Sequence, residues 1–177
     1  METFNIRMQS ENINYVDLSK ELIPDYLIMI NDKNISRFIS TKDKHYTYEN
    51  EFDWVCQKLK EKALIFSMIE RKTNNFIGNV ELMNVTNDSA EIGISITANY
   101  QNKHYGSEAM NMIIDYSFNK LKLKELRLIV FSHNQRAIHL YEKLGFIQYK
   151  IEKNVAVIDG KTVDDIYMKL DHKNYLC

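Results

Sequence analysis

Hydrophobic positions in the first third of the chain are spaced as in a helix flanked by less regular segments. Apolar residues recur three or four positions apart, which predicts a helix; they are Leu22, Ile23, Tyr26, Leu27 and Ile30. Asp17 or Ser19 is a suitable N-cap, and Pro24 falls in the first turns, where proline is tolerated. Residues 3–8 read as a first strand and residues 34–47 as a loop.

The next apolar positions predict a helix followed by three strands. The helix covers residues 48–62 and carries one apolar stripe; the stripe comprises Phe52, Val55, Cys56 and Leu59. Strands are predicted over 64–70 and 76–85, joined by a polar turn, and a further strand over 90–97.

The second half of the chain reads as helix, strand, helix and hairpin. A helix over 107–120 has apolar positions at i, i+3, i+4 and i+7; these are Ala109, Met112, Ile113 and Tyr116. The run 126–131 is apolar apart from Arg127, which is typical of a central strand covered on both faces.

Asn134 is a suitable N-cap for the last of these helices, and Gly145 lies where a left-handed turn commonly ends one. Its apolar positions are Ala137, Leu140, Tyr141 and Leu144. Strands over 146–158 and 162–170 follow, joined by Asp159-Gly160, a strong hairpin signal. The pattern therefore predicts one α/β domain over residues 1–177, a mixed sheet with about four helices.

The composition is that of an ordinary globular protein and excludes several classes. Of 177 residues, 45% are hydrophobic and 27% charged, and the formal net charge of −1 gives no general attraction to nucleic acid or to an anionic membrane. No signal peptide and no membrane-spanning apolar run are expected. Cys56 and Cys177 are not spaced as a metal-binding or redox pair, so we expect a cytoplasmic protein that binds no metal. Cys56 is interpreted as a half-buried helical thiol rather than a nucleophile.

Residues 92–109 combine a buried strand, a short polar turn ending in Gly106 and the start of a helix. Such a turn gathers unpaired backbone N–H groups at the positive end of a helix dipole, which suits a phosphate. By itself this signal is weak, because many strand-to-helix connections share it.

Two motifs together resemble a known family. The first is the turn Gln101-Asn102-Lys103-His104-Tyr105-Gly106; the second, about thirty residues on, is Asn134-Gln135-Arg136-Ala137-Ile138-His139-Leu140-Tyr141-Glu142-Lys143-Leu144-Gly145-Phe146. The chain thereby resembles the GCN5-related N-acetyltransferases (GNAT), and within them the RimJ/RimL-like branch. The second motif is the more specific, and the similarity is clear over residues 76–170.

The resemblance implies the GNAT fold, a mostly antiparallel twisted sheet of six to seven strands with a splayed central parallel pair. It also implies acetyl-CoA as acetyl donor, with pantetheine pairing along the strand near residues 92–97 and pyrophosphate at the turn. The positions matched to cofactor binding are Ile94, Ile96, Gln101, Asn102, Lys103, His104, Tyr105, Gly106, Ser107, Asn134, Ala137 and Tyr141.

Asn134 and Tyr141 are two helical turns apart and so share one face of their helix. By the resemblance, Asn134 reaches the pantetheine amides and Tyr141 is the general acid for the departing thiolate. Because the pKa of a thiol is ~8.5 and that of a phenol ~10, a hydrogen bond can suffice in place of full proton transfer.

The turn departs from the family pattern at His104, where glycine is usual. If that position needs φ > 0, histidine is among the less disfavoured substitutes, and we expect cofactor binding to survive. We favour a tolerated surface residue over a catalytic role for His104. Glu108 suits the helix dipole but would repel phosphate, so its side chain should point away from the turn.

Two carboxylates are candidates for the general base that deprotonates the attacking amine. Glu91 matches the proposed base of polyamine-type family members, although it lies some ~13 Å along the strand from Ser95, which would require a water relay. Glu81 is the second candidate. For both, a structural or solvated carboxylate is an equally weighted interpretation.

Three functions follow as hypotheses. The leading one is direct acetyl transfer from acetyl-CoA to a primary amine in a ternary complex, the amine belonging to a small molecule or to a peptide N-terminus such as that of a ribosomal protein. The second is a non-catalytic CoA-binding module, which the presence of Tyr141 disfavours. The third, an unrelated nucleotide-binding protein, would need a GxGxxG motif or a P-loop lysine, and the sequence has neither.

The acceptor is left open by the sequence. A polyamine (spermidine or spermine type) is the alternative acceptor, but the segment 41–53 is mixed rather than acidic, and Asn84 stands where polyamine-type members tend to have a carboxylate. Both points argue against a dedicated polyamine enzyme without excluding one. Tyr46, Tyr48, Phe52 and Trp54 could line an amine pocket or simply pack a helix on the sheet. A homodimer is plausible by resemblance alone.

Overall fold

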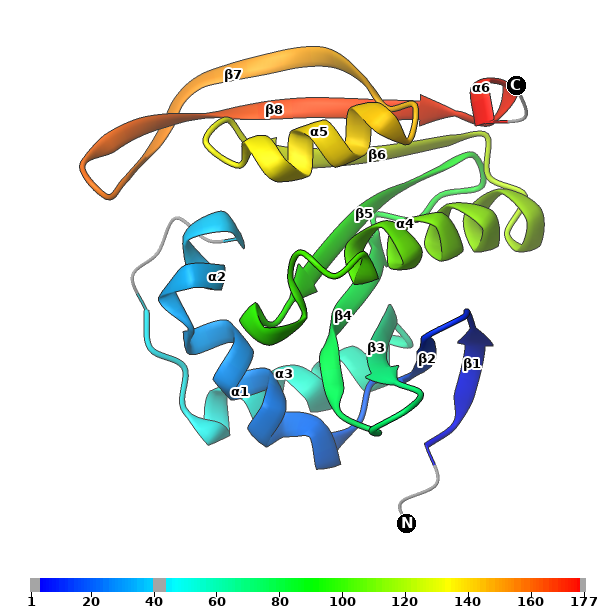
Figure 1. Cartoon of the computed structure of the whole chain (residues 1–177), viewed down its shortest axis with the longest axis vertical. Helices are drawn as coiled ribbons and strands as arrows, with labels where there is room; N and C mark the ends of the chain where they lie inside the picture. Colours follow the sequence, from blue (N-terminus) through cyan, green and yellow to red (C-terminus); the bar gives the residue numbers. More distant parts are fainter. Residues whose placement is uncertain (1–3, 40–43, 176–177) are drawn as a thin grey trace. The chain divides into compact units, whose positions relative to one another are not determined.

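Eight strands form one mixed sheet, in the order β1-β2-β3-β4-β5-β6-β8-β7, in the computed structural model, which describes residues 4–39 and 44–175 (Figure 1). The predicted α/β fold class is confirmed; the sheet has one strand more than the upper predicted number. The chain divides into two compact units, residues 1–82 with 93–112 and residues 83–92 with 113–177. β5 (Ser89–Ile96) and α4 (Tyr105–Asp115) each contribute residues to both units.

The first unit opens with the antiparallel pair β1 (Ile6–Gln9) and β2 (Ile13–Asp17). The predicted strand over 3–8 corresponds to β1, although residue 3 lies outside the described residues. β2 was not predicted, because it starts within a polar stretch and its apolar residues, Ile13, Tyr15 and Val16, do not alternate strictly with polar ones. β2 then pairs antiparallel with β3 (Leu64–Glu70), which pairs with β4 (Phe76–Met83).

The predicted first helix is confirmed as a 3-10 turn, η1 (Lys20–Leu22), continued by α1 (Ile23–Asn31). The Ser19 side chain caps the turn by accepting from the Glu21 N–H at 3.2 Å. The helix buries Tyr26, whose hydroxyl lies 2.6 Å from Ser67 Oγ on β3. The core of this unit joins α1 and β3 and consists of Val16, Leu18, Leu22, Ile23, Tyr26, Met29, Ile35, Val55, Ile65, Ile69 and Phe76.

The predicted loop over 34–47 is wrong in its first part, since α2 (Lys33–Ile39) is helical. Asp32 starts this helix: its carboxylate accepts from the Asn34 N–H at 2.8 Å, and its carbonyl from the Ser36 N–H at 2.8 Å. Of its seven residues, only Ile35 is buried.

The helix predicted over 48–62 is α3 (Tyr48–Glu61), which begins with a capping box between Thr47 and Asn50. Its predicted apolar stripe is wrong at two of four positions, and Cys56 is half-buried as predicted. Val55 is fully buried, but Phe52 and Leu59 are 36% and 42% exposed, and the other buried position is Glu51. The buried face therefore follows Glu51 and Val55, and partly buried Trp54 packs against the core, which favours the packing interpretation of that aromatic residue.

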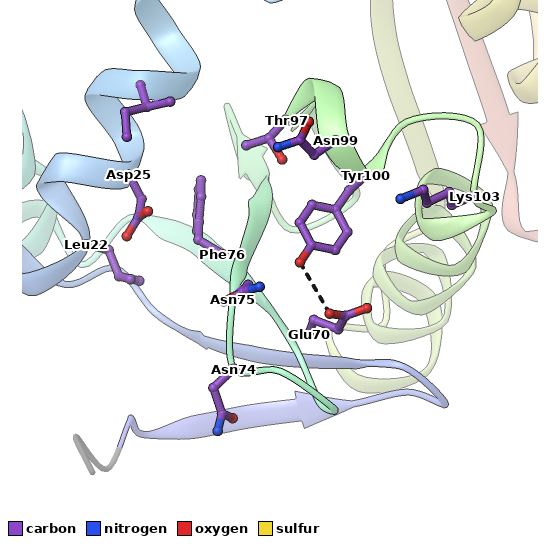
Figure 2. A pocket seen from close by; sticks show the side chains of 11 residues that line it. Leu22, Asp25, Glu70, Asn74, Asn75, Phe76, Thr97, Asn99, Tyr100 and Lys103 are labelled. Carbon is purple, nitrogen blue, oxygen red and sulfur yellow. Dashed lines mark hydrogen bonds between the residues drawn. The ribbon is translucent and has the colours of Figure 1, made fainter.

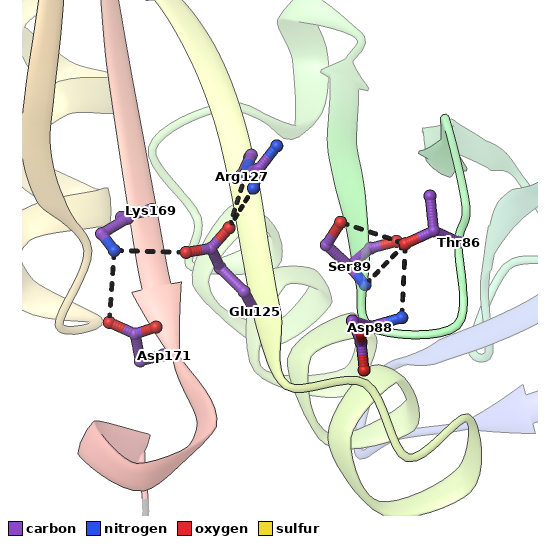
Figure 3. Close-up of polar contacts among 7 residues, drawn as sticks. All are labelled: Thr86, Asp88, Ser89, Glu125, Arg127, Lys169 and Asp171. Carbon is purple, nitrogen blue, oxygen red and sulfur yellow. Dashed lines mark hydrogen bonds and ion pairs between the residues drawn. The ribbon is translucent and has the colours of Figure 1, made fainter.

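The second unit contains the start of β5, which pairs parallel with β6 (Glu125–Phe131) at three recorded positions, Ser89, Ala90 and Glu91. Polar contacts hold the neighbouring chain segments (Figure 3): Thr86 Oγ1 accepts from the Asp88 and Ser89 N–H groups, and Glu125 pairs with Arg127 and Lys169. These contacts lie at the starts of β5 and β6, where the two strands pair.

β6 was predicted to be covered on both faces, and this is wrong. Its burial alternates: Leu126, Leu128 and Val130 are buried, whereas Ile129 is 42% exposed. β6 pairs antiparallel with β8 (Lys161–Asp171), and β8 with β7 (Ile147–Ile158). The predicted hairpin is confirmed, with positive φ at Asp159 and Gly160.

The remaining helices follow the sequence pattern. Helix α4 runs on into a π-helical segment, η3 (Tyr116–Lys120), and α5 (Gln135–Lys143) is capped by Asn134 as predicted. Gly145 has φ +92° just after α5, which is the left-handed ending expected of glycine there. A four-residue helix, α6 (His172–Tyr175), follows β8. In the described part of the chain, no helix is long and apolar enough to cross a bilayer.

Candidate active site

The turn before α4 has left-handed backbone at position 104, so the condition considered in the sequence analysis, a positive φ at His104, is met. His104 has φ +67° and Asn102 has φ +58°. The missing glycine is therefore replaced by a residue that tolerates this region better than most. Two side chains brace the turn: Gln101 Nε2 donates to the Ile96 carbonyl at 2.9 Å, and Ser107 Oγ donates to the His104 carbonyl at 2.8 Å.

Helix α4 starts at Tyr105, so Gly106 and Ser107 lie in its first turn, where backbone N–H groups have no partner within the helix. Ser107 is thus a brace for the turn in this structure. The side chain of Glu108 points away, as predicted: its carboxylate accepts from Ser10 Oγ at 2.6 Å and from the backbone N–H and side-chain amide of Asn12 at 2.7 and 3.0 Å. The anionic group of the first turn is thereby occupied by the β1–β2 connection.

A carboxylate that the sequence did not single out contacts both ends of the turn. Glu70, the last residue of β3, accepts hydrogen bonds from the Tyr100 hydroxyl at 3.2 Å and from the Tyr105 hydroxyl. Thirty or more residues separate Glu70 from these tyrosines, and no local pattern links them.

A pocket of about 550 Å3 lies in the same unit, beside the turn (Figure 2). It is lined by Leu22, Asp25, Ile28, Glu70, Asn74, Asn75, Phe76, Thr97, Asn99, Tyr100 and Lys103. Burial raises the pKa of Asp25. One lining residue, Thr97, directly follows Ile96, so the pocket adjoins the end of the proposed pantetheine strand.

That strand end is shaped by a close backbone approach. A Cβ atom at Gly78 on β4 would lie 2.0 Å from the Ser95 carbonyl oxygen, so only glycine fits there. The Thr97 N–H donates to the Ile77 carbonyl at 2.9 Å, which completes the contact between β4 and β5. Ile94 and Ile96 are half-buried on this segment.

In the second unit, α5 carries two of the predicted cofactor residues, Ala137 and Tyr141, and a third, Asn134, caps its start. Asn134 Oδ1 accepts from the Ala137 N–H at 3.3 Å, which leaves the Asn134 amide nitrogen to act as a donor. Tyr141 is 8% exposed, its ring lies 6.0 Å from that of Phe146, and burial raises the pKa of its phenol to about 12. The phenol is therefore protonated at every physiological pH.

The two candidate bases lie on different strands and in different units. Glu91 is half-buried on β5, and Asn84 Nδ2 donates to it at 3.5 Å. Glu81 is half-buried on β4, opposite Ile65 of β3. Among residues 4–39 and 44–175, no group of three or more His, Cys, Asp or Glu side chains is arranged to hold a metal ion.

Comparison with known proteins identifies the family of this chain. A family model described as an acetyltransferase (GNAT) domain matches residues 14–147, about three quarters of the chain. The chain belongs to the GNAT acetyltransferase family. The resemblance carried by the two sequence motifs is thereby confirmed at the level of the family.

Two acetyltransferase relatives illustrate the range of sequence identity and coverage. The spermidine N(1)-acetyltransferase of Escherichia coli K12 is 35% identical over 134 residues, 76% of this chain and 66% of that protein. Acetyltransferase PseH of Campylobacter jejuni strain 81-176 is 28% identical over 151 residues, 85% of this chain and 93% of that protein. The chain spans just under two thirds of the length of the curated spermidine acetyltransferases it matches.

Solved structures support the same fold. The crystal structure of spermidine N-acetyltransferase from Vibrio cholerae, in complex with CoA and spermine, superposes with a TM-score of 0.86 at 24% identity, covering 95% of this chain and all of that one. At this identity the likeness establishes the GNAT fold.

Proposed function

We propose that this protein transfers an acetyl group from acetyl-CoA to a primary amine, by direct attack of the amine in a ternary complex. The observation that carries the proposal is the turn before α4. Left-handed backbone at Asn102 and His104 leads into the helix N-terminus, and the one carboxylate of that first turn, Glu108, is held away by Ser10 and Asn12. A concave row of N–H groups of this kind suits a diphosphate.

The first unit supplies the groups that bind the cofactor's phosphates and arm. Residues 101–107 hold the diphosphate through backbone N–H groups, with Lys103 exposed to add positive charge. Peptide groups of Ile94 and Ile96 pair with the amide-rich arm, and the N–H near Ile96 holds the carbonyl oxygen where negative charge develops. Acetyl-CoA supplies the activated thioester, and the protein positions it.

A donor and an acid are proposed on one face of α5. The Asn134 amide nitrogen donates to the arm, and Ala137 is small enough to allow a close approach. Tyr141 donates a hydrogen bond to the departing sulfur. With a pKa near 12 against ~8.5 for a thiol, the phenol keeps its proton and stabilises the thiolate as a hydrogen-bond donor.

Glu91 is the favoured general base, because Asn84 donates to it and so orients one of its oxygens. Glu81 is the second candidate. Either would act on an ammonium whose pKa is ~10 and which must lose a proton before it attacks.

The acceptor is a small-molecule amine or a peptide N-terminus, as expected in the RimJ/RimL-like branch. A polyamine is the second candidate, favoured by the relatives named as spermidine acetyltransferases. Asn84 holding Glu91 disfavours it, because a carboxylate at position 84 would add a site for a second ammonium. We further propose that the protein is a single-domain cytoplasmic enzyme and a homodimer, with no metal and with no nucleic-acid or membrane partner.

Titration calorimetry with acetyl-CoA, NAD and ATP tests the cofactor. The protein is expected to bind acetyl-CoA but neither NAD nor ATP. If it did not bind acetyl-CoA, both the acetyltransferase hypothesis and the hypothesis of a CoA-binding module would be overturned. Thiol release would then be measured with spermidine, aminoglycosides, amino acids and N-terminal peptides. Saturable release with one class identifies the acceptor, whereas binding without release from any amine would indicate a non-catalytic CoA-binding module.

A further inference from the structure

Two tyrosines bracket the left-handed turn, and both donate to one carboxylate. Tyr100 immediately precedes residues 101–104, and Tyr105 immediately follows them. The Tyr100 hydroxyl lies 3.2 Å from Glu70 Oε2, as drawn in Figure 2, and the Tyr105 hydroxyl donates to Glu70 Oε1. The two rings also meet edge to face, with their centroids 5.3 Å apart. The turn is therefore closed at both ends on the same side chain.

Glu70 is itself placed by the sheet and not by the turn. It pairs with Ile13 of β2, and its backbone N–H donates to the Asn75 carbonyl at 2.8 Å. Thr73 Oγ1 donates to its carboxylate at 2.5 Å. The carboxylate is thus a fixed point to which the two tyrosines are tied.

The turn needs such a fixed point because it lacks the glycine that would make its backbone easy. Left-handed φ is disfavoured for residues with a Cβ, and it persists where the surrounding structure enforces it. Asn102 and His104 both have left-handed φ, and both lie between the two tied tyrosines.

We propose that Glu70 is a positioning residue: by accepting from Tyr100 and Tyr105 it holds residues 101–104 in the left-handed conformation that directs their N–H groups to the cofactor diphosphate. This inference rests on the proposed acetyl-CoA site. Glu70 acts through the two tyrosines and does not itself touch the cofactor, since a carboxylate would repel phosphate.

The protonation states of the three groups agree with this role. Hydrogen bonds from Thr73 and then from Tyr105 lower the pKa of Glu70, and the bond to Glu70 raises the pKa of Tyr105 to about 12. At neutral pH the contact is thus between a carboxylate and protonated phenols, with the Lys103 ammonium as the nearby cation.

The test compares Glu70→Gln with Glu61→Gln, a matched change at an exposed carboxylate of α3 that is held by Gln57 and Lys58. Calorimetry with CoA is expected to show about tenfold weaker binding for Glu70→Gln and none of this loss for Glu61→Gln. With acetyl-CoA as varied substrate, KM should rise by the same factor, while kcat at saturating cofactor stays within about twofold. A general loss of structure would instead lower kcat, because less enzyme is folded, without a matching rise in KM.

A double-mutant cycle distinguishes loss of the hydrogen bond between Tyr105 and Glu70 from a general loss of structure. One of its single variants keeps Glu70 unchanged. Tyr105→Phe alone should weaken CoA binding about fivefold, and adding it to Glu70→Gln should weaken binding little further, since the shared contact is already gone. Equal binding by Glu70→Gln and Glu61→Gln, or additive effects in the cycle, would overturn the inference. If the unchanged protein bound no CoA, the proposed function itself would fall.

Discussion

The Glu108 carboxylate accepts hydrogen bonds from both the backbone N–H and the side-chain amide of Asn12, at 2.7 and 3.0 Å. This pair links the first turn of α4 to the connection between β1 and β2. Within the first unit, the helix start that carries the proposed phosphate site is thus anchored on the strand pair that opens the chain.

Glu108→Ala is expected to lower the free energy of unfolding by about 2 kcal/mol, because it removes a charged acceptor and leaves the Asn12 N–H without it. Partial burial raises the pKa of Glu108, but the hydrogen bonds from Ser10 and Asn12 outweigh burial, and the pKa is lowered overall. A lowered pKa means that the stabilisation is present above the ordinary value of 4.5 and is lost as the pH falls through the folded value.

Urea unfolding at pH 7 and near pH 3 measures this. The difference between the unchanged protein and Glu108→Ala should shrink at the lower pH. Glu11→Ala, at an exposed neighbouring carboxylate, should show no difference at either pH. A deficit of equal size at both pH values would mean that the ionised carboxylate is not what stabilises this contact.

His104→Gly and His104→Val should move stability in opposite directions. At φ +67° a Cβ is disfavoured, so glycine should raise the free energy of unfolding by about 0.5 kcal/mol after its own entropy loss is counted. Valine, β-branched and intolerant of this region, should lower it by about 1–2 kcal/mol. CoA affinity should follow the same order. Similar values for glycine and valine, measured by thermal unfolding and calorimetry, would show that the turn is not under this constraint.

How far the sequence predicts this molecule depends on the distance between interacting residues. The orientation of Glu108 away from the turn and the capping by Asn134 were predictable, because each follows from neighbours within a turn or from the charge expected at a helix end. The left-handed backbone of His104 was a conditional expectation, drawn from the glycine usual at that position in the family. Glu70 was not predictable, since its partners lie thirty residues on and nothing local marks it.

Burial was predicted less well than secondary structure. In α3, Phe52 and Leu59 lie at helical spacing with Val55, yet only Val55 reaches the core. In β6, the apolar run hid an alternation that leaves Ile129 exposed. In both cases an apolar side chain was read as buried, although a large share of any protein surface is apolar. The direction in which an element faces is decided by its packing partners.

Asn134 has two separable tasks, and two substitutions distinguish them. Asn134→Ala removes the cap that Ala137 N–H uses, and it should cost about 1 kcal/mol of unfolding free energy. Asn134→Asp keeps an acceptor at the cap but has no amide donor, so stability should be retained. Both variants should raise KM for acetyl-CoA. If Asn134→Asp bound acetyl-CoA normally, Asn134 would be a cap and nothing more.

Tyr141→Phe is expected to lower kcat about a hundredfold, with KM for acetyl-CoA within about twofold, because in the proposed mechanism the hydroxyl would contact only the departing sulfur. Burial raises the pKa of Tyr141 to about 12, so the protonated form is retained as the pH rises through 10. The rate of the unchanged enzyme should therefore show no decline from Tyr141 below about pH 10. Tyr149→Phe, at an exposed tyrosine of β7, is the control. Unchanged turnover in Tyr141→Phe across a broad amine panel would remove the acid role.

Glu91→Gln should lose most activity at low pH, where the largest fraction of the amine is protonated and needs a base. A primary ammonium with a pKa of ~10 is about 0.1% deprotonated at pH 7 and about a quarter deprotonated at pH 9.5. The rate deficit of Glu91→Gln should therefore be about a hundredfold at pH 7 and shrink towards tenfold or less at pH 9.5. Glu81→Gln, measured over the same pH range, should show no such narrowing. If the narrowing appeared in Glu81→Gln instead, the base would be Glu81, and a constant deficit in both would assign the two carboxylates to structure.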